Sequence, residues 1–482
     1  MAFKLRTYRK YIEILFAVIL LYGILFNYSK LILSVSENYH PVWSDEFFYF
    51  ANTDSFIQNN TLKAALTLGG EGSILFGADP HGFGYPLLHG VIGKIFGWSN
   101  LNMIYFNFLI ICIPIILIYR MKTISISQKM WIVISILSFP FFSLYAFTYM
   151  QEIIHVFTAL LLSFLMYNIY QKDKEDNGIY VLLYILLIFI AGIFRSLWLF
   201  WLVGILPLAE DKKQFVRYIA IFAFGIFFSF LVNHYVYEPV PNYFSSLIDF
   251  LKKGEFGELF SSLVSNFWNN LRLYFFDDQG SVIYLLIKYV NLGVVIYFTS
   301  IAIKTKNEIS ISLASIGVLN FLLLFFLYDA FSWREIRTMS PLFYFYIIFI
   351  VTNSKSIIQY LQVIILCLLF LSSMEMSRER IAERNEIDVN KFIESKEAFF
   401  EIAEKIPGNS KVLISYLPED HSLDVLNLPL STNTNLPIHY IIQYYDLYIP
   451  SYHYVLSKPG VNYEQYRKVI DNQYYTLFKV RK

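Results

Sequence analysis

The sequence predicts a mainly α, polytopic helical membrane protein that ends in a small α/β domain. Hydrophobic residues make up 56% of the 482 positions and charged residues only 16%, whereas a soluble domain carries about 25% charged residues. The apolar residues gather in eleven long blocks, which is typical of membrane-spanning helices. After about residue 375, charged residues and short strand patterns replace these blocks.

Each apolar block is compared with the roughly 20 residues that a spanning helix needs. The blocks fall at about residues 11–33, 101–119, 130–147, 151–170, 179–194, 197–209, 214–234, 282–303, 309–328, 338–353 and 356–374. The first is too long for the apolar region of a cleaved signal peptide, so we expect an uncleaved first span. The blocks at 179–194 and 197–209 are short, and the boundary between them stays open.

The segment 82–98 decides the orientation of the chain. It contains Gly84, Gly90, Gly93, Gly97 and Pro86 beside His89 and Lys94, so we expect an outer-surface or re-entrant helix rather than a span. With that choice, basic residues gather in alternate loops, as the positive-inside rule requires. The inner group comprises Lys4, Arg6, Arg9, Lys10, Arg120, Lys122, Lys129, Lys172, Lys174, Lys212, Lys213, Arg217, Lys304, Lys306 and Lys355. We therefore expect about eleven spans, a cytoplasmic N-terminus and an extracytoplasmic C-terminal domain.

A transmembrane domain is expected over residues 1–375. It includes the outer loop 34–100, with its juxtamembrane helix at 82–98, and the outer loop 235–281. The second loop contains a helical pattern with one apolar face, which predicts an amphipathic helix in the membrane interface. The apolar face comprises Phe256, Leu259, Phe260, Leu263, Val264, Phe267 and Leu271.

Residues 376–482 are expected to form a small extracytoplasmic α/β domain. The charged stretch 377–405 predicts a helix, and Pro-Gly at positions 407 and 408 ends it. Strand patterns follow at 411–417, 452–457 and 474–480. We expect this domain to serve in packing or in recognition of an acceptor.

Composition excludes some classes of function. The net charge is +1 and no basic patch with interleaved aromatic residues lies outside the membrane flanks, so we expect no nucleic-acid partner. Cys112 and Cys367 both lie inside apolar blocks, which argues against a disulfide framework or a cysteine-ligated metal.

The first outer loop carries two segments with candidate chemistry. The sequence Trp-Ser-Asp-Glu-Phe begins at position 43 and contains Asp45 and Glu46, and the sequence Ala-Asp-Pro-His-Gly begins at position 78 and contains Asp79 and His81. Other ionisable residues mark the outer ends of spans. They are Glu152, Arg195, Arg334 and Arg337.

In order and spacing over roughly residues 1–375, these segments resemble the polytopic GT-C glycosyltransferases, in particular the protein-mannosyltransferase and aminoarabinose-transferase branch. In that branch an Asp-Glu pair follows the first span, and Asp45-Glu46 match it. A His-Pro-Pro or Lys-Pro-Pro segment then opens a juxtamembrane helix that runs into Phe-Gly. Residues 79–81 match its start and 95–97 its end, but Gly-Phe replaces the double proline.

The resemblance implies an enzyme that moves a hexosyl or pentosyl group from a polyprenyl phosphate to a glycan, lipid or protein acceptor outside the membrane. Such a reaction needs a base for the acceptor, cations for the leaving phosphate and an apolar groove for the lipid. The match makes Asp45 the candidate base, oriented by Glu46. Arg195, Arg334 and Arg337 are the candidates for the phosphate, because a guanidinium matches two phosphate oxygens at once.

Three further residues are expected to bind substrate. His81 is placed to hydrogen-bond the same phosphate, and Asp79 and Glu152 are acids near the outer face that also match the family pattern.

The cofactor is left open, since members of the family differ in whether a divalent cation is used. Asp45 and Glu46 are the pair that would hold one. Glu152 and His155 also lie one helical turn apart, a spacing that can bind metal, but no second ligand pair is near them in sequence.

Each candidate also has a simpler interpretation. Asp45 and Glu46 fit solvated acids of an outer loop. Arg195 fits a side chain that reaches the interface, and Arg334 and Arg337 fit anchors at the end of a span.

Two other functions compete with the GT-C interpretation. An O-antigen polymerase or ligase would carry key arginines in a large late loop, whereas the acidic loop here comes first. A lipid or glycan flippase would show internal repeats and ionisable residues within its spans. The amino-acid composition indicates an AT-rich genome. We therefore expect a bacterial protein that lies in the cell membrane.

Overall fold

The computed structural model describes the chain except for a set of short segments. These are residues 1, 37–38, 40, 42–43, 67–73, 77–81, 100, 172–176, 233–242, 277–281, 329–335, 354–355, 386–400, 402–404, 407–410, 416–438, 444–453, 458–459, 461–465, 473–475 and 481–482. The chain divides into two compact units. The first, here the helical unit, comprises Met1–Ser34, Pro80–Gly82 and Ile104–Ile381. The second, here the loop-and-sheet unit, comprises Val35–Asp79, Phe83–Met103 and Ala382–Lys482.

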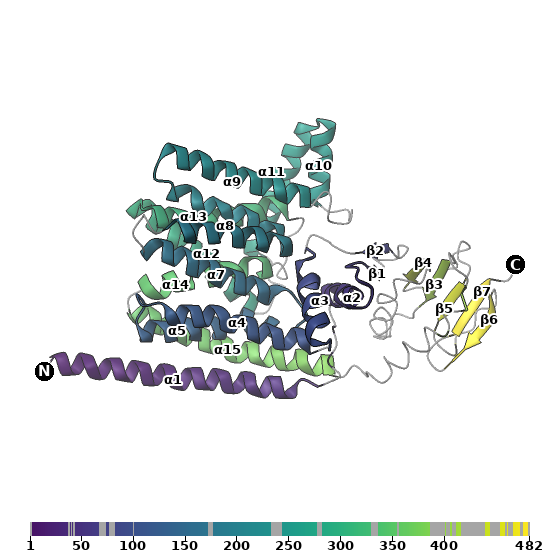
Figure 1. Ribbon diagram of the computed structural model, residues 1–482, viewed down its shortest axis with the longest axis horizontal. Helices are drawn as coiled ribbons and strands as arrows, with labels where there is room; N and C mark the ends of the chain where they lie inside the picture. The colour runs from purple at the N-terminus through teal and green to yellow at the C-terminus, as the bar shows by residue number, and fades with distance from the viewer. Residues whose placement is uncertain are drawn as a thin grey trace. The chain divides into compact units, whose positions relative to one another are not determined.

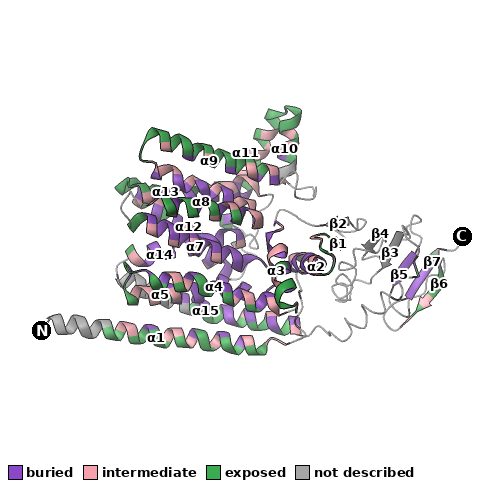
Figure 2. Cartoon of the chain, in the orientation of Figure 1, coloured by how far each residue is buried: buried purple, intermediate pink, exposed green. Residues whose placement is uncertain are grey.

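All eleven apolar blocks fall on helices, which confirms the polytopic helical fold (Figure 1). The helices are α1 (Ala2–Ser34), α4 (Asn102–Arg120), α5 (Ile126–Ser138), α6 (Pro140–Ala146), α7 (Glu152–Gln171), α8 (Gly178–Phe194), η2 (Ser196–Leu208), α9 (Lys212–Leu231), α12 (Val282–Thr305), α13 (Glu308–Leu327), α14 (Ile336–Asn353) and α15 (Ser356–Asn385). Within the described residues, six of them are long and apolar enough to cross a membrane alone: α1, α4, α7, α9, α12 and α13. Figure 2 shows α7 largely buried, whereas α9 exposes much of its apolar surface, as a lipid-facing helix does.

The block at 130–147 is a bent span rather than a straight one. Pro140 begins α6, and the axis turns by 53° between α5 and α6. Proline has no N–H to donate and clashes with the preceding turn, so it ends a helix and starts the next one well. The bend is held by α15, because Ser143 Oγ donates to Ser373 Oγ at 2.6 Å and Ser377 Oγ donates to the Ser143 carbonyl at 2.7 Å.

The short block at 197–209 is the 3₁₀ helix η2, which has 13 residues. A 3₁₀ helix rises about 2.0 Å per residue instead of about 1.5 Å, so the segment covers roughly 26 Å rather than 20 Å. Residues three apart are eclipsed in such a helix. Trp198 and Trp201 accordingly lie one above the other, with ring centroids 4.5 Å apart.

The segment between α9 and α12, expected as an outer loop, contains α10 (Tyr243–Lys253) and α11 (Phe256–Phe276), and the buried stripe of α11 is polar. Asn266 Nδ2 donates to the carbonyl of Phe326 at 3.0 Å, and Asn270 Nδ2 to that of Phe325 at 3.1 Å. These carbonyls belong to the last turn of α13, where no intrahelical donor remains. Phe267 of the predicted apolar face stacks on Phe326, with ring centroids 4.7 Å apart, whereas Phe256 and Phe260 are exposed, so the asparagines and part of the apolar face together attach α11 to the unit.

The loop-and-sheet unit contains two helices, a small hairpin and a five-stranded sheet. Helix α2 (Ser44–Asn59) packs against α3 (Gly84–Phe96), and β1 (Ala64–Leu66) pairs with β2 (Ile74–Phe76). The C-terminal sheet has the order β4-β3-β5-β7-β6. Its strands are β3 (Lys411–Ser415), β4 (His439–Gln443), β5 (Tyr454–Ser457), β6 (Tyr466–Asp471) and β7 (Thr476–Val480).

Three of these strands were expected from the sequence, and β4 and β6 were not. Strand β3 runs parallel to β4 and β5, and β7 runs antiparallel to β5 and β6. Strand β6 lies at an edge and exposes Arg467 and Lys468. Edge strands carry such charges to prevent pairing with other chains, so the alternation that marks a strand is lost there.

Candidate active site

The predicted acidic pair lies in the first turn of α2, in the loop-and-sheet unit. Asp45 is half-buried and Glu46 is fully buried. Acidic side chains are stabilised at a helix N-terminus by the helix dipole. Consecutive helical residues point about 100° apart, so the two carboxylates have different surroundings.

Glu46 forms a closed ion pair with Arg384 at the end of α15. Nη2 of Arg384 lies 2.8 Å from both carboxylate oxygens, and both side chains have no exposed surface. Burial alone lowers the pKa of Arg384, but the Glu46 carboxylate and Tyr39 outweigh it and raise that pKa above its ordinary value. Arg384 therefore stays charged and neutralises Glu46.

This pairing decides how the acidic pair can treat a metal ion. A divalent cation takes carboxylate oxygens as ligands, and both oxygens of Glu46 already face the Arg384 guanidinium. The Glu46 carboxylate is thus occupied by Arg384, so the acidic pair does not fit a two-carboxylate metal site. Elsewhere in the described part of the chain, no three His, Cys, Asp or Glu side chains come together to hold a metal.

The helical unit contains a second buried pair, between Glu152 and Arg195. Glu152 begins α7, and Arg195 lies in extended backbone between α8 and η2. Nη2 of Arg195 lies 3.4 Å from Oε1 of Glu152. The other oxygen, Oε2, is buried and has no hydrogen-bond partner among the described residues. A buried carboxylate oxygen without a partner is costly, so this pair is incomplete in a way that a ligand could satisfy.

Further charged side chains surround Tyr145, next to this pair. The Tyr145 phenol is within electrostatic range of Glu152, Arg337 and Arg380. Arg380 Nη2 donates to the Tyr284 hydroxyl at 2.9 Å, and its guanidinium lies 5.9 Å from the centre of the Tyr145 ring. Arg195, Arg337 and Arg380, which lie near Glu152 or Tyr145, are here called the arginine cluster.

Local packing fixes the position of Arg195. Trp198 Nε1 donates to Nδ1 of His155 at 2.9 Å, one turn beyond the Glu152 pair on both helices. His155 thereby serves to anchor η2, and its Nδ1 is engaged by a tryptophan instead of a metal. On the other side, Gly82 lies so close to the end of α8 that a Cβ there would be 2.4 Å from the carbonyl oxygen of Ile193.

The structure thus places the predicted residues in three groups. Glu152, Arg195 and Arg337 come together around Tyr145, although they are distant in sequence. Asp45 and Glu46 lie in the other unit. The last group, Asp79, His81 and Arg334, lies outside the described residues.

Two arginines of α15, Arg380 and Arg384, were not among the site residues predicted from the sequence, because the stretch 377–405 was expected to be a charged outer helix. A signal was present, because buried residues recur every three or four positions along α15 and continue into the charged part. They are Leu366, Phe370, Ser373, Ser377, Ile381 and Arg384. Arg384 falls on this buried stripe. Lys288 of α12, which is 3% exposed, was also missed.

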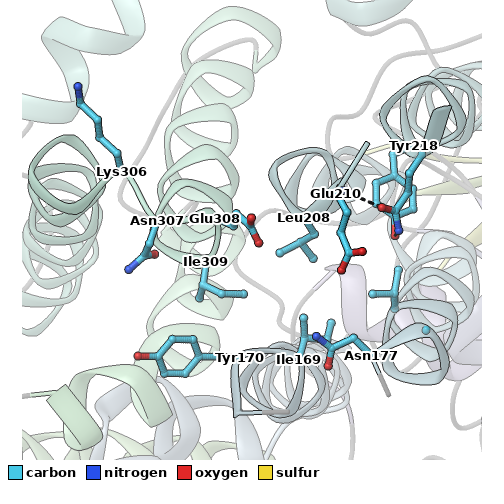
Figure 3. Close-up of a pocket in the computed structure, with 13 residues that line it drawn as sticks. Ile169, Tyr170, Asn177, Leu208, Glu210, Tyr218, Lys306, Asn307, Glu308 and Ile309 are labelled. Carbon is cyan, nitrogen blue, oxygen red and sulfur yellow. Dashed lines mark hydrogen bonds between the residues drawn. The ribbon is translucent and has the colours of Figure 1, made fainter. Parts of the chain in front are cut away.

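A cavity of about 520 Å³ lies elsewhere in the helical unit (Figure 3). It is lined by the end of α7 at Tyr170 and by the start of α8 at Asn177, with the carboxylates of Glu210 and Glu308 pointing into it. Glu152 and Arg195 lie at the opposite ends of α7 and α8. The cavity contains none of the candidate residues, so it is separate from the arginine cluster.

Comparison with known proteins defines the class of fold. No family model matches the sequence, and no curated protein sequence matches it either. The crystal structure of ArnT from Cupriavidus metallidurans bound to undecaprenyl phosphate is similar over 96% of this chain and 97% of that one, with a TM-score of 0.50 and 8% identity. The oligosaccharyltransferase of Archaeoglobus fulgidus, in complex with zinc and sulfate, matches 90% of this chain and 67% of its own, with a TM-score of 0.48 and 11% identity.

The chain has the GT-C fold, as the residue pattern predicted. ArnT is an aminoarabinose transferase, and the likeness to it extends over nearly the whole of both chains. At 8% identity the likeness concerns the fold, and the chemistry is argued from the residues.

Proposed function

We propose that this chain is a membrane glycosyltransferase that moves a sugar from a polyprenyl-phosphate carrier to an acceptor on the outer side of the membrane. The observation that carries the proposal is the arginine cluster, which lies among apolar helices beside the incompletely paired Glu152. Guanidinium groups bind phosphate oxygens in pairs, and they do so most strongly where water is scarce. ArnT, which has this fold, was crystallised with undecaprenyl phosphate, and this supports a lipid phosphate as the ligand.

In this proposal Asp45 takes the proton of the acceptor hydroxyl or amine. The acceptor atom then bonds to the anomeric carbon of the sugar while the bond from that carbon to the phosphate oxygen breaks. The lipid phosphate leaves with the bonding electrons, and guanidinium groups stabilise its negative charge, which is the role that the resemblance to the GT-C enzymes gives to Arg195 and Arg337. Glu152 accepts a hydrogen bond from the donor through its buried Oε2.

His81, Asp79 and Arg334 keep their predicted roles as further substrate contacts. The distribution of basic loops supports an N-terminus inside and a C-terminal sheet outside the membrane. The acceptor is a glycan, a lipid or a protein.

The test uses the purified full chain in nanodiscs, supplied with polyprenyl-phosphate sugars, and measures released lipid phosphate. We expect the wild type to consume at least one donor and Asp45→Asn to bind the donor without turnover. Asp249→Asn is the matched control, because Asp249 is an exposed acid of α10 and should leave the rate unchanged. A fully active Asp45→Asn variant would remove Asp45 as the base.

A lipid flippase is the second candidate, on the observation that α12 buries Lys288 within the helical unit. Buried lysines within spans often mark a transport path. In the same nanodiscs, a flippase would leave the donor intact and move a fluorescent analogue between leaflets. Consumption of the donor with release of lipid phosphate excludes it.

A further inference from the structure

The buried contact between α15 and α2 points to a role for Arg384 in the reaction. We infer that Arg384 is a positioning residue for Asp45, and that it acts through the Glu46 carboxylate. This rests on the proposed function, in which Asp45 is the base.

The contacts with Arg384 fix the position of the Glu46 carboxylate. A single guanidinium nitrogen holds both of its oxygens at 2.8 Å, and neither side chain has exposed surface. Asp45 is the adjacent residue of the same helical turn. Because the direction of a helical side chain follows from the rotation of its helix, holding Glu46 fixes where the Asp45 carboxylate points.

The next residue of α15 holds the chain on the other side of Asp45. The side-chain oxygen of Asn385 accepts hydrogen bonds from the backbone N–H of Ser36 at 3.0 Å and from its hydroxyl at 2.9 Å. Two consecutive residues at the end of α15 therefore fix Ser36 and Glu46, which lie before and after the candidate base in sequence. Placement of a reacting group to within about 1 Å is worth up to a hundredfold in rate.

Arg384 also sets the charge beside Asp45. With Arg384 in place the buried pair is neutral, and the other ionisable groups that act on it are Tyr39 and Glu383. Without the arginine charge, Glu46 would place a second negative charge next to Asp45. Adjacent like charges raise the pKa of a carboxylate, so Asp45 would ionise at a higher pH.

The experiment compares three changes in the full chain in nanodiscs. Arg384→Lys keeps the charge but not the planar guanidinium, and Arg384→Gln removes the charge. The double change Glu46→Gln with Arg384→Gln removes both charges and keeps groups that hydrogen-bond. Arg378→Lys is the control, because Arg378 lies on the same helix in an exposed pair with Glu375. Thermal unfolding identifies the variants that fold, and the steady-state rate is measured across the acidic and neutral pH range.

For Arg384→Lys we expect a fall in kcat of about ten- to hundredfold, with the KM for donor changed less than about twofold. In Arg384→Gln the acidic limb of the kcat/KM profile should move up by about half a pH unit or more, and the double change should return it to its original position. If Arg384→Gln does not fold, the lysine variant and the double variant still decide the question.

The inference is overturned if the folded variants keep the wild-type kcat, or if the lysine variant raises KM and leaves kcat unchanged. Its failure is distinct from failure of the proposed function. A wild type that consumes donor, together with unaffected Arg384 variants, removes only the positioning role. A wild type that consumes no donor removes the proposed function and this inference together.

Discussion

Two buried glutamate–arginine pairs occur in the described part of the chain, and they differ in how many of their carboxylate oxygens are paired. Arg384 holds both oxygens of Glu46 at 2.8 Å. Arg195 reaches one oxygen of Glu152 at 3.4 Å, and the second oxygen has no hydrogen-bond partner in the described part of the chain. Both carboxylate oxygens of the first pair are held within the protein, whereas the second pair leaves one carboxylate oxygen as an acceptor for a ligand. Buried charge alone therefore does not mark a binding site; incomplete pairing does.

The two pairs also differ in the charged groups that surround them. Glu46 and Arg384 neutralise one another. Beside Glu152 and Arg195, the additional arginines Arg337 and Arg380 produce an excess of positive charge. We therefore expect changes at the first pair to act mainly on stability and local geometry, and changes at the second to act mainly on the donor.

The largest effect on stability is expected from Arg384→Met. Removal of one partner leaves the buried Glu46 carboxylate without its counter-charge, which costs about 3–5 kcal/mol of unfolding free energy. Chemical unfolding in detergent micelles measures this. The double change Glu46→Leu with Arg384→Met should recover most of the loss, because a buried pair replaced by apolar groups is often neutral. A single variant as stable as the wild type would show that the pair is solvated in the protein.

The next effect concerns the incomplete pair. Arg195→Met should lower kcat/KM for the donor about a hundredfold, equivalent to about 2.7 kcal/mol, because a cation that stabilises the leaving phosphate is lost. Arg272→Met is the control, since Arg272 lies on the exposed surface of α11. The comparison between the two pairs fails if Arg195→Met instead lowers stability as much as Arg384→Met and leaves the kinetics of the folded fraction unchanged.

The sequence was sufficient for the helices because each span needs a long apolar block, and all eleven blocks proved helical. The bend at Pro140 also has a local cause that the sequence displays. The proline was visible in the single apolar block at 130–147. These features depend on neighbours in sequence.

The partners in the two pairs could not be predicted in this way. Glu46 and Arg384 are 338 positions apart, and Arg195 lies 43 positions from Glu152. No local pattern states which arginine meets which acid. Arg378, Arg380 and Arg384 look alike in the charged end of α15, yet only Arg384 is fully buried. Tertiary packing makes that distinction. In the sequence, its only sign is that Arg384 falls at the three- to four-residue spacing of the buried residues of α15.

Gly82 tests whether backbone packing holds Arg195 in place. Gly82 has φ +79°, and an added Cβ would lie 2.4 Å from the backbone oxygen of Ile193. Gly82→Ala should cost about 2–3 kcal/mol, from the strained backbone and from the forced displacement together. Gly97→Ala is matched in backbone, at φ +88°, but meets nothing within 4 Å, so we expect only about 1 kcal/mol there. Equal losses in the two variants would show that the contact with α8 contributes nothing.

The smallest effect is a pH dependence in the loop-and-sheet unit, which should arise from His89 rather than from the closed pair. His89 of α3 is buried beside Tyr85, with ring centroids 4.4 Å apart, and burial lowers its pKa to about 3. The unfolded chain, with a histidine pKa of about 6.5, binds a proton between these values while the folded chain does not. Stability is therefore complete above about pH 6.5 and falls as the pH drops, by about 2 kcal/mol between pH 7 and pH 5.

The variant His89→Phe keeps the ring against Tyr85 and removes the titrating group. Chemical unfolding at pH 7 and pH 5 should show a loss in the wild type that exceeds the loss in His89→Phe by about 2 kcal/mol, and the two proteins should be most alike at pH 7. The other histidines and the carboxylates contribute equally to both proteins, so the difference isolates His89. Equal losses would mean that His89 accepts its proton within the folded unit.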